Sequence, residues 1–179
     1  RRTGAASAGA AGGRGATGVP QSRKQGGPGA EAERTNAAHA GAAMAVAAHA
    51  GKPDELASLV DATLERHGRI DILVNNAATN PYFGHTVDAD LGAWDKTFEV
   101  NVRGVFALTQ LAVNRYMGEH RGAIVNVASV GGIRVAFGLG IYHNPRAATI
   151  PLTKPPPHHP GPHSRRVTGV APAPRPPLL

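Results

Sequence analysis

Apolar residues recur at helical spacing in two stretches of this chain. Within residues 53–68 they return every three or four positions, with Pro53 and two acidic residues at the start and Gly68 at the end. Proline and acidic side chains suit the first turn of a helix, and glycine suits the position after its last turn. We therefore predict a helix over 53–67 and a longer one over 94–119, which Gly122 follows. The long helix places these residues on one apolar face: Phe98, Val102, Val105, Phe106 and Thr109.

Short, mainly apolar runs lie before, between and after these helices. They span residues 44–48, 70–74 and 123–128, and each is of strand length. Helix and strand thus alternate from 44 to 129 with short connections, a pattern typical of a parallel α/β sheet with helices on its faces. Sheets of this kind bind ligands at the carboxyl ends of their strands. We therefore look for chemistry in the residues that directly follow each run.

Polar residues follow two of the three runs. Asn75 comes after the second run, and Ser129 comes after the third. Asn101 lies on the predicted long helix 28 residues before Ser129, and Tyr142 lies 13 residues after it. Together with the stretch Asp71-Ile72-Leu73-Val74-Asn75-Asn76-Ala77, this order and spacing resembles the short-chain dehydrogenase/reductase family over about residues 50–150.

The resemblance implies an α/β fold with a partial Rossmann-like doubly wound parallel sheet, and a nicotinamide cofactor. It assigns Tyr142 as the acid/base, Ser129 as the donor that orients the substrate oxygen, and Asn101 as the support of a proton-relay water. Asn75 and Ala77 fall on the cofactor side of the sheet. Hydride transfer to a carbonyl requires an acid for the developing alkoxide, and a phenol near a cation serves this purpose. The stretch over residues 75–84 is similar to the same stretch in family members that reduce ketones and aldehydes.

Each of these residues also has an ordinary structural explanation when it is taken alone. A serine at a strand end is usually a cap or turn residue, and a tyrosine is usually a packing residue. An asparagine within a helix is often only solvated. Their joint order and spacing favours the functional interpretation.

The sequence departs from the family where a Tyr-x-x-x-Lys pattern is expected. Arg146 stands in place of the lysine, and Pro145 precedes it. Arginine keeps the positive charge and the ability to donate to a ribose, but its planar guanidinium is not equivalent to an ammonium. Proline disfavours helix at the preceding residue, Asn144, so we expect Pro145 to disturb the helix that carries Tyr142 unless that helix begins at Tyr142, and we expect Pro151 to break it.

The start of the chain keeps part of the family's phosphate-binding signature. Thr3, Gly4 and Gly9 are candidate cofactor-binding residues, although Gly9 is one place out of register and alanines replace the other glycines. Arg23 and Lys24 resemble the basic end of the family's second strand, where such residues pair with the 2′-phosphate of NADP. This favours NADP slightly over NAD. A flexible segment with unpaired charges is the alternative explanation. Near the other end, residues 166–172 resemble the family's sixth strand.

The formal net charge of +7 belongs to the ends of the chain. Residues 1–50 and residues 151–179 each carry a net charge of +4, whereas residues 51–150 carry −1. All eight aromatic residues lie between Tyr82 and Tyr142. A nucleic-acid-binding domain would instead cluster basic side chains on a folded face, with aromatics among them. We therefore expect no nucleic-acid partner.

These shifts in composition divide the chain into three parts. We predict a degenerate, low-complexity cofactor-binding start over 1–43, a Rossmann-like core over 44–150, and a Pro/His/Arg-rich tail over 151–179. The Ala/Gly-rich first part and the Pro-rich last part are expected to be poorly ordered. The tail histidines lie among prolines without a carboxylate, so we expect no metal site there.

Several classes of protein are excluded by what the sequence lacks. The chain has no cysteine, which excludes a disulfide scaffold and thiolate metal sites. It has no run of about 18 apolar residues, so we expect no membrane span. Arg1 and Arg2 lack the apolar stretch of a secretory signal behind them, and we expect a cytoplasmic protein.

Three hypotheses for function follow. The first is an NAD(P)-dependent oxidoreductase that acts on a small carbonyl or secondary alcohol. The second is a catalytically impaired member that keeps only the middle of the fold, and the third is an interaction protein that uses its basic ends on acidic partners. Homo-oligomers are usual in the family, but the prolines near Tyr142 put assembly through that helix in question here.

Overall fold

The structure is a computed structural model of the whole chain, and it describes residues 21–22, 32–33, 36–37, 43–120, 122–134, 137–153 and 165–171. Five of the candidate cofactor-binding residues lie outside the described residues: Thr3, Gly4, Gly9, Arg23 and Lys24. Most residues of the two ends, which the sequence predicts to be poorly ordered, also lie outside the described residues. The division at residues 43 and 151 stays a prediction.

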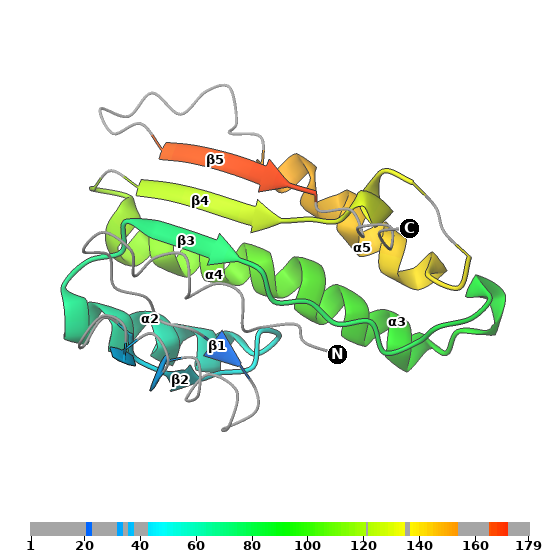
Figure 1. Cartoon of the computed structure of the whole chain (residues 1–179), viewed down its shortest axis with the longest axis horizontal. Coiled ribbons are helices and arrows are strands. Elements are labelled where there is room, and N and C mark those ends of the chain that lie inside the picture. The colour runs from blue at the N-terminus through cyan, green and yellow to red at the C-terminus, as the bar shows by residue number, and fades with distance from the viewer. Residues whose placement is uncertain are drawn as a thin grey trace.

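The sheet is parallel, as the alternation of helix and strand predicts. Strands β3, β4 and β5 are hydrogen-bonded in that order, and they run the same way in Figure 1. A separate parallel pair is formed by β1 and β2. The α/β fold class with a parallel sheet is therefore confirmed. The strands have these bounds: β1 Gln21–Ser22, β2 Val46–Ala47, β3 Ile72–Asn75, β4 Gly122–Val127 and β5 Arg165–Val170.

Helix α2, Pro53–His67, has the ends that the sequence predicts. Pro53 occupies the first turn, where a missing N–H costs nothing, and the two acids beside it face the positive end of the helix dipole. Gly68 ends the helix in the left-handed conformation, with φ of 66°, and its N–H donates to Leu64 O at 2.7 Å. A side chain at that φ would be strained, so this position favours glycine.

The predicted long helix is present, but it is not a regular α-helix throughout. It begins at Leu91 rather than at 94, because Asp90 caps it by accepting a hydrogen bond from Ala93 N at 2.7 Å. Two stretches of π-helix widen it, and nothing in the spacing of apolar residues predicts them. In order along the chain the parts are α3 Leu91–Phe98, η3 Glu99–Arg103, α4 Gly104–Ala112 and η4 Val113–Met117.

The single apolar face expected on this helix is divided in the structure. Val105 is buried, whereas 54% of Phe106 is exposed. The wider turn of η3 changes the angular position of every later residue, so residues that share a face on an ideal helix separate here. Phe98, Val102 and Phe106 consequently line an open pocket rather than the sheet.

The core lies between the sheet and helices α2 and α4. Its main cluster consists of Val60, Ile70, Ala112, Met117 and Ile124, all buried. A second cluster, Ala48, Leu56 and Leu59, packs α2 against β2 and the residue that follows it. Burial of the valine, isoleucine and methionine side chains of the main cluster contributes about 1.5–3 kcal/mol each relative to exposure.

One glycine sets the distance between α4 and the loop after β2. A Cβ built on Gly104 would lie 2.0 Å from Ala50 O, which is a backbone atom. Contacts under about 3 Å do not occur between such atoms in folded proteins. Glycine is therefore required for this close approach.

The segment after β4 forms a short 3₁₀ turn and then a helix beside the carboxyl end of the sheet (Figure 1). The turn is η5, Val130–Gly132, and the helix is α5, Gly140–Thr149. Pro145 is tolerated inside α5 and is buried, and the helix begins at Gly140, two residues before the start at Tyr142 on which its tolerance is expected to depend. A proline at this position removes one hydrogen bond, and the packing of its buried ring offsets that loss. The expected end of the helix before Pro151 is confirmed.

Two further 3₁₀ turns are η2 Thr86–Asp88 and η6 Pro151–Thr153. Among the described residues, no helix combines the length and apolar character that crossing a bilayer requires. The same residues contain no cluster of side chains suited to holding a metal ion.

Candidate functional site

Ser129 follows β4 and caps the short turn η5. Its Oγ accepts a hydrogen bond from Gly131 N at 3.1 Å. A hydroxyl that accepts from a backbone N–H keeps its own proton for a second bond. Ser129 is half-buried at the carboxyl end of the sheet, so a donor remains at the edge where parallel sheets bind ligands.

Tyr142 and Arg146 lie one turn apart on α5 and are bonded to each other. Arg146 Nε donates to Tyr142 Oη at 2.9 Å, and Nη1 donates to Val127 O, the last residue of β4, at 2.8 Å. The guanidinium carbon also lies 5.0 Å from the centre of the Tyr142 ring. Arg146 thereby attaches α5 to the end of β4 and holds the phenol oxygen beside the sheet.

Arg146 is buried although it is a cation, with 6% of its surface exposed. Within the described part of the chain, no carboxylate forms an ion pair with it. A buried charge is costly unless polar partners surround it. The guanidinium has five N–H donors, so it can bind further oxygen acceptors in addition to Tyr142 and Val127.

Asn101 is fully buried on the π-helical stretch η3. Its Oδ1 accepts from Thr79 N at 2.8 Å, and its Nδ2 donates to Thr79 O at 2.9 Å. Both ends of the amide are thus bonded to one residue of the loop after β3. The side chain fixes this loop, and the role expected for Asn101 as support of a relay water stays a prediction.

Asn75 ends β3 and is bonded within the fold. Its Nδ2 donates to Asn126 Oδ1 at 2.8 Å and to Thr109 Oγ1 at 3.0 Å. These bonds connect β3 with β4 and with α4. Ala77 follows two residues later, half-buried in the loop that Asn101 holds through Thr79.

The fold brings four of the predicted residues to one end of the sheet. Helix α5, with Tyr142 and Arg146, packs against η5 next to Ser129 and against η3 with Asn101. Sequence reasoning missed His143, whose Nδ1 contacts Gly131 O, and it missed Thr79 as the partner of Asn101. The adjacent glycines 131 and 132 are a signal for the first contact, since paired glycines often mark a close approach of two elements.

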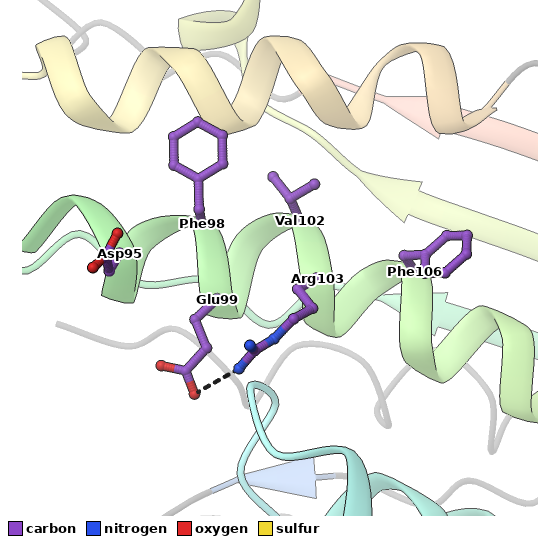
Figure 2. A pocket seen from close by; sticks show the side chains of 6 residues that line it. All are labelled: Asp95, Phe98, Glu99, Val102, Arg103 and Phe106. Carbon is purple, nitrogen blue, oxygen red and sulfur yellow. Dashed lines mark ion pairs between the residues drawn. The ribbon is translucent and has the colours of Figure 1, made fainter.

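A separate pocket lies on the outer face of the long helix and has a volume of about 590 Å³. Figure 2 shows aromatic and aliphatic side chains along it, together with the Glu99–Arg103 pair. Lys96 donates to Glu99 at 2.7 Å and lowers the pKa of the Glu99 carboxyl below its ordinary value, while burial acts in the opposite direction. None of the predicted site residues lines this pocket.

The described residues fit the nicotinamide end of a dinucleotide cofactor. The buried guanidinium of Arg146 has donors to spare for ribose hydroxyls, and it lies beside the phenol at the carboxyl end of the sheet. Both ends of the Asn101 amide and the Nδ2 group of Asn75 are bonded within the protein, so these groups would shape this end of the site rather than bind the cofactor. The candidate residues for the pyrophosphate lie outside the described residues.

Comparisons with known proteins give one consistent result. Residues 3–176 match the family described as enoyl-(acyl carrier protein) reductase. The pig protein named dehydrogenase/reductase SDR family member 4 is 35% identical over 157 residues, which is 86% of this chain and 55% of that protein. Its rabbit counterpart is 39% identical over 106 residues, which is 59% of this chain and 41% of that protein. The chain therefore spans about half the length of the curated relatives it matches.

Solved structures agree in fold. A short-chain dehydrogenase/reductase from Burkholderia phymatum, in complex with NAD, has a TM-score of 0.77 and 26% identity, covering 84% of this chain and 54% of that one. A Serratia marcescens short-chain dehydrogenase/reductase variant (F98L/F202L) has a TM-score of 0.76 and 28% identity, covering 85% of this chain and 62% of that one. From the fold, the matched residues and these relatives together, the chain belongs to the short-chain dehydrogenase/reductase family.

Proposed function

We propose that this chain carries the reaction centre of an NAD(P)-dependent oxidoreductase that interconverts a carbonyl and a secondary alcohol. The observation that supports this most directly is the phenol of Tyr142, held by Arg146 at the carboxyl end of β4. Ser129 supplies a hydroxyl at the same end of the sheet. An acid and an oriented hydroxyl donor are the two groups that carbonyl reduction requires of the protein.

The bound nicotinamide would supply the hydride. Ser129 Oγ, which accepts from Gly131 N, donates a hydrogen bond to the substrate oxygen, keeps its proton, and so orients the carbonyl. Tyr142 Oη gives its proton to the same oxygen as negative charge develops there. Arg146 Nε donates to Tyr142 Oη and stays bonded to it after the proton leaves.

Arg146 also provides the argument for the alternative, an impaired family member. Two of its nitrogens are already bonded to Tyr142 and Val127, and its planar guanidinium holds the remaining donors in a fixed geometry that differs from that of a lysine ammonium. Cofactor binding and turnover must therefore be measured separately. The choice of NADP over NAD rests on Arg23 and Lys24 in the sequence alone, and the cytoplasmic location likewise stays a prediction from sequence.

We expect NADPH to bind the purified chain and to raise its melting temperature. At a concentration of about 100 times Kd, a ligand specific for the folded state adds about 2.7 kcal/mol of stability. For a chain of this size the melting temperature rises by roughly 2–4 °C per kcal/mol, so a shift of about 5 °C or more is expected. Differential scanning fluorimetry with NADPH, NADH and ADP-ribose measures it, with NADPH expected to act at the lowest concentration.

The outcome separates the three hypotheses. No shift and no fluorescence change at near-millimolar NADPH overturns the oxidoreductase proposal for this chain and favours an interaction protein. NADPH binding together with turnover of benzaldehyde supports the oxidoreductase proposal. Binding without turnover, followed by activity in the double variant Pro145→Ser/Arg146→Lys, identifies an impaired enzyme.

The outer pocket supports a second proposal, the pairing of two copies of this chain. Phe98, Val102 and Phe106 are spaced four residues apart and give the long helix an apolar stripe (Figure 2). In an antiparallel pair with its axis near Val102, Phe98 of one copy would face Phe106 of the other, so the apolar stripe complements itself.

Phe106→Glu is expected to abolish this pairing. A carboxylate within the apolar stripe would be buried without a partner in the dimer, which costs several kcal/mol. Sedimentation at micromolar concentrations should give the mass of two chains for the unmodified protein and of one chain for the variant. Phe83→Glu is the control, because Phe83 is exposed (69%) and lies outside the pocket. A single-chain mass for the unmodified protein, or an unchanged mass for Phe106→Glu, overturns the proposal.

A further inference from the structure

His143 is buried on α5, next to Tyr142 in the chain, and its ring faces the turn η5. Its Nδ1 lies within hydrogen-bond distance of Gly131 O. A carbonyl oxygen can only accept, so the imidazole must carry a proton on Nδ1. In free histidine either ring nitrogen can carry the proton, and this contact selects one form.

Gly131 transmits the contact to Ser129. While its carbonyl accepts from His143, its N–H donates to Ser129 Oγ at 3.1 Å. The two polar groups of one glycine thus connect the imidazole with the hydroxyl. Both groups use backbone atoms, so a movement of the imidazole displaces the donor that holds Ser129.

The packing around Gly131 leaves little room for adjustment. A Cβ built on Gly131 would lie 2.8 Å from His143 Nδ1 and 3.4 Å from Ser129 Oγ. Gly132 is equally close to α5, since its Cβ would lie 2.8 Å from the backbone carbon of Arg146. The turn therefore lies flat against α5, and the imidazole is one of the groups that fix its position.

We propose that His143, protonated on Nδ1, is a positioning residue that orients the Ser129 hydroxyl through Gly131. With Gly131 N–H held on one side of Oγ, the hydroxyl proton is left for an acceptor outside the protein. Tyr142 and His143 are adjacent on α5, so one helix sets the positions of both the phenol and the serine. The identity of the group to which Ser129 donates rests on the proposed function. The contact from His143 through Gly131 to Ser129 does not depend on it.

The proton on Nδ1 is tested without any activity. Long-range ¹⁵N–¹H spectra of the full chain, with His143 assigned by the loss of its signals in His143→Leu, are expected to show a protonated Nδ1 at pH 7.5. An unprotonated Nδ1 overturns the proposal. This result does not depend on cofactor or substrate, so it stands apart from a failure of the proposed function.

Two matched variants test the orientation of Ser129. His143→Asn would keep an N–H near the position of Nδ1, whereas His143→Leu introduces a side chain of similar size with no donor. Both lose the ring, so their melting temperatures are expected to fall by similar amounts. Hydrogen exchange of the Gly131 amide is expected to be at least about tenfold faster in His143→Leu than in His143→Asn, because the loss of the donor frees the turn.

Turnover divides the variants in the same way if the chain is active. With NADPH and benzaldehyde, His143→Leu is expected to lower kcat by about tenfold or more with little change in KM, since a small misplacement of an orienting group acts on the transition state. His143→Asn should retain kcat within about threefold. Equal Gly131 exchange in the two variants, or equal kcat values, overturns the proposal.

Discussion

Tyr142→Phe is expected to reduce carbonyl reduction by a factor of about 10² to 10⁴, the usual contribution of a positioned general acid. The ring remains against the Arg146 guanidinium at 5.0 Å, so the helix keeps this contact. Only the phenol oxygen is lost, and with it the acceptor of the bond from Arg146 Nε. The rate of NADPH oxidation with saturating benzaldehyde measures the effect.

The structure offers a matched control in Tyr116→Phe. Tyr116 lies on η4, where its ring stacks on His120 with centroids 4.0 Å apart, and it has no part in the candidate site. Its variant should keep the activity of the unmodified chain. Leaving Arg146 Nε without its acceptor costs about 1–3 kcal/mol, so Tyr142→Phe should also melt at a lower temperature while still binding NADPH. Activity retained in Tyr142→Phe contradicts the assignment of the phenol as the acid.

Gly104→Ala is expected to destabilise the fold by about 3 kcal/mol, at the upper end of the range for an added methyl group in a packed region. The new Cβ would lie 2.0 Å from Ala50 O, so α4 and the loop after β2 must separate. A backbone carbonyl cannot rotate away as a side chain does. The melting temperature should fall by about 6–12 °C, given roughly 2–4 °C per kcal/mol for a chain of this size.

Gly92→Ala is the matched control for this change. Gly92 also lies in the long helix, but it is exposed, and its Cβ would meet only a side-chain atom, Asp90 Oδ1 at 3.0 Å, which needs to shift by only a few tenths of an ångström. Because alanine is the better helix former by about 1 kcal/mol, this variant should be neutral or slightly more stable. Equal losses in the two variants would show that helix propensity rather than the approach to Ala50 governs Gly104.

The parts of the fold that the sequence predicts well are those with local causes. Helix α2 begins and ends where Pro53 and Gly68 require, since φ preferences and the helix dipole act within a few residues. Strands β3 and β4 follow from short apolar runs, and β5 follows from the family resemblance of residues 166–172. The parallel sheet follows from the alternation of these elements.

The parts that the sequence does not predict depend on distant contacts. The π-helical turn at Asn101 accompanies its bonds to Thr79, which lies 22 residues earlier. Pro145 is accommodated because its ring is buried against the rest of the fold. Local rules for proline do not include the packing energy of a buried ring. His143 reaches Gly131 only because α5 folds back onto η5. The pattern of motifs identified candidate residues, but not the partners that hold them.

The pair Asn75 and Asn126 has a consequence for how the sheet assembles. The two residues are opposite each other in the ladder of β3 and β4, and both are buried. A slip of one residue in either direction would place Asn75 opposite a valine and separate the two amides, at about 1–3 kcal/mol for each group left unpaired. Misaligned pairings of these two apolar strands are therefore poor kinetic traps, and the chain reaches the native alignment with few competing compact states.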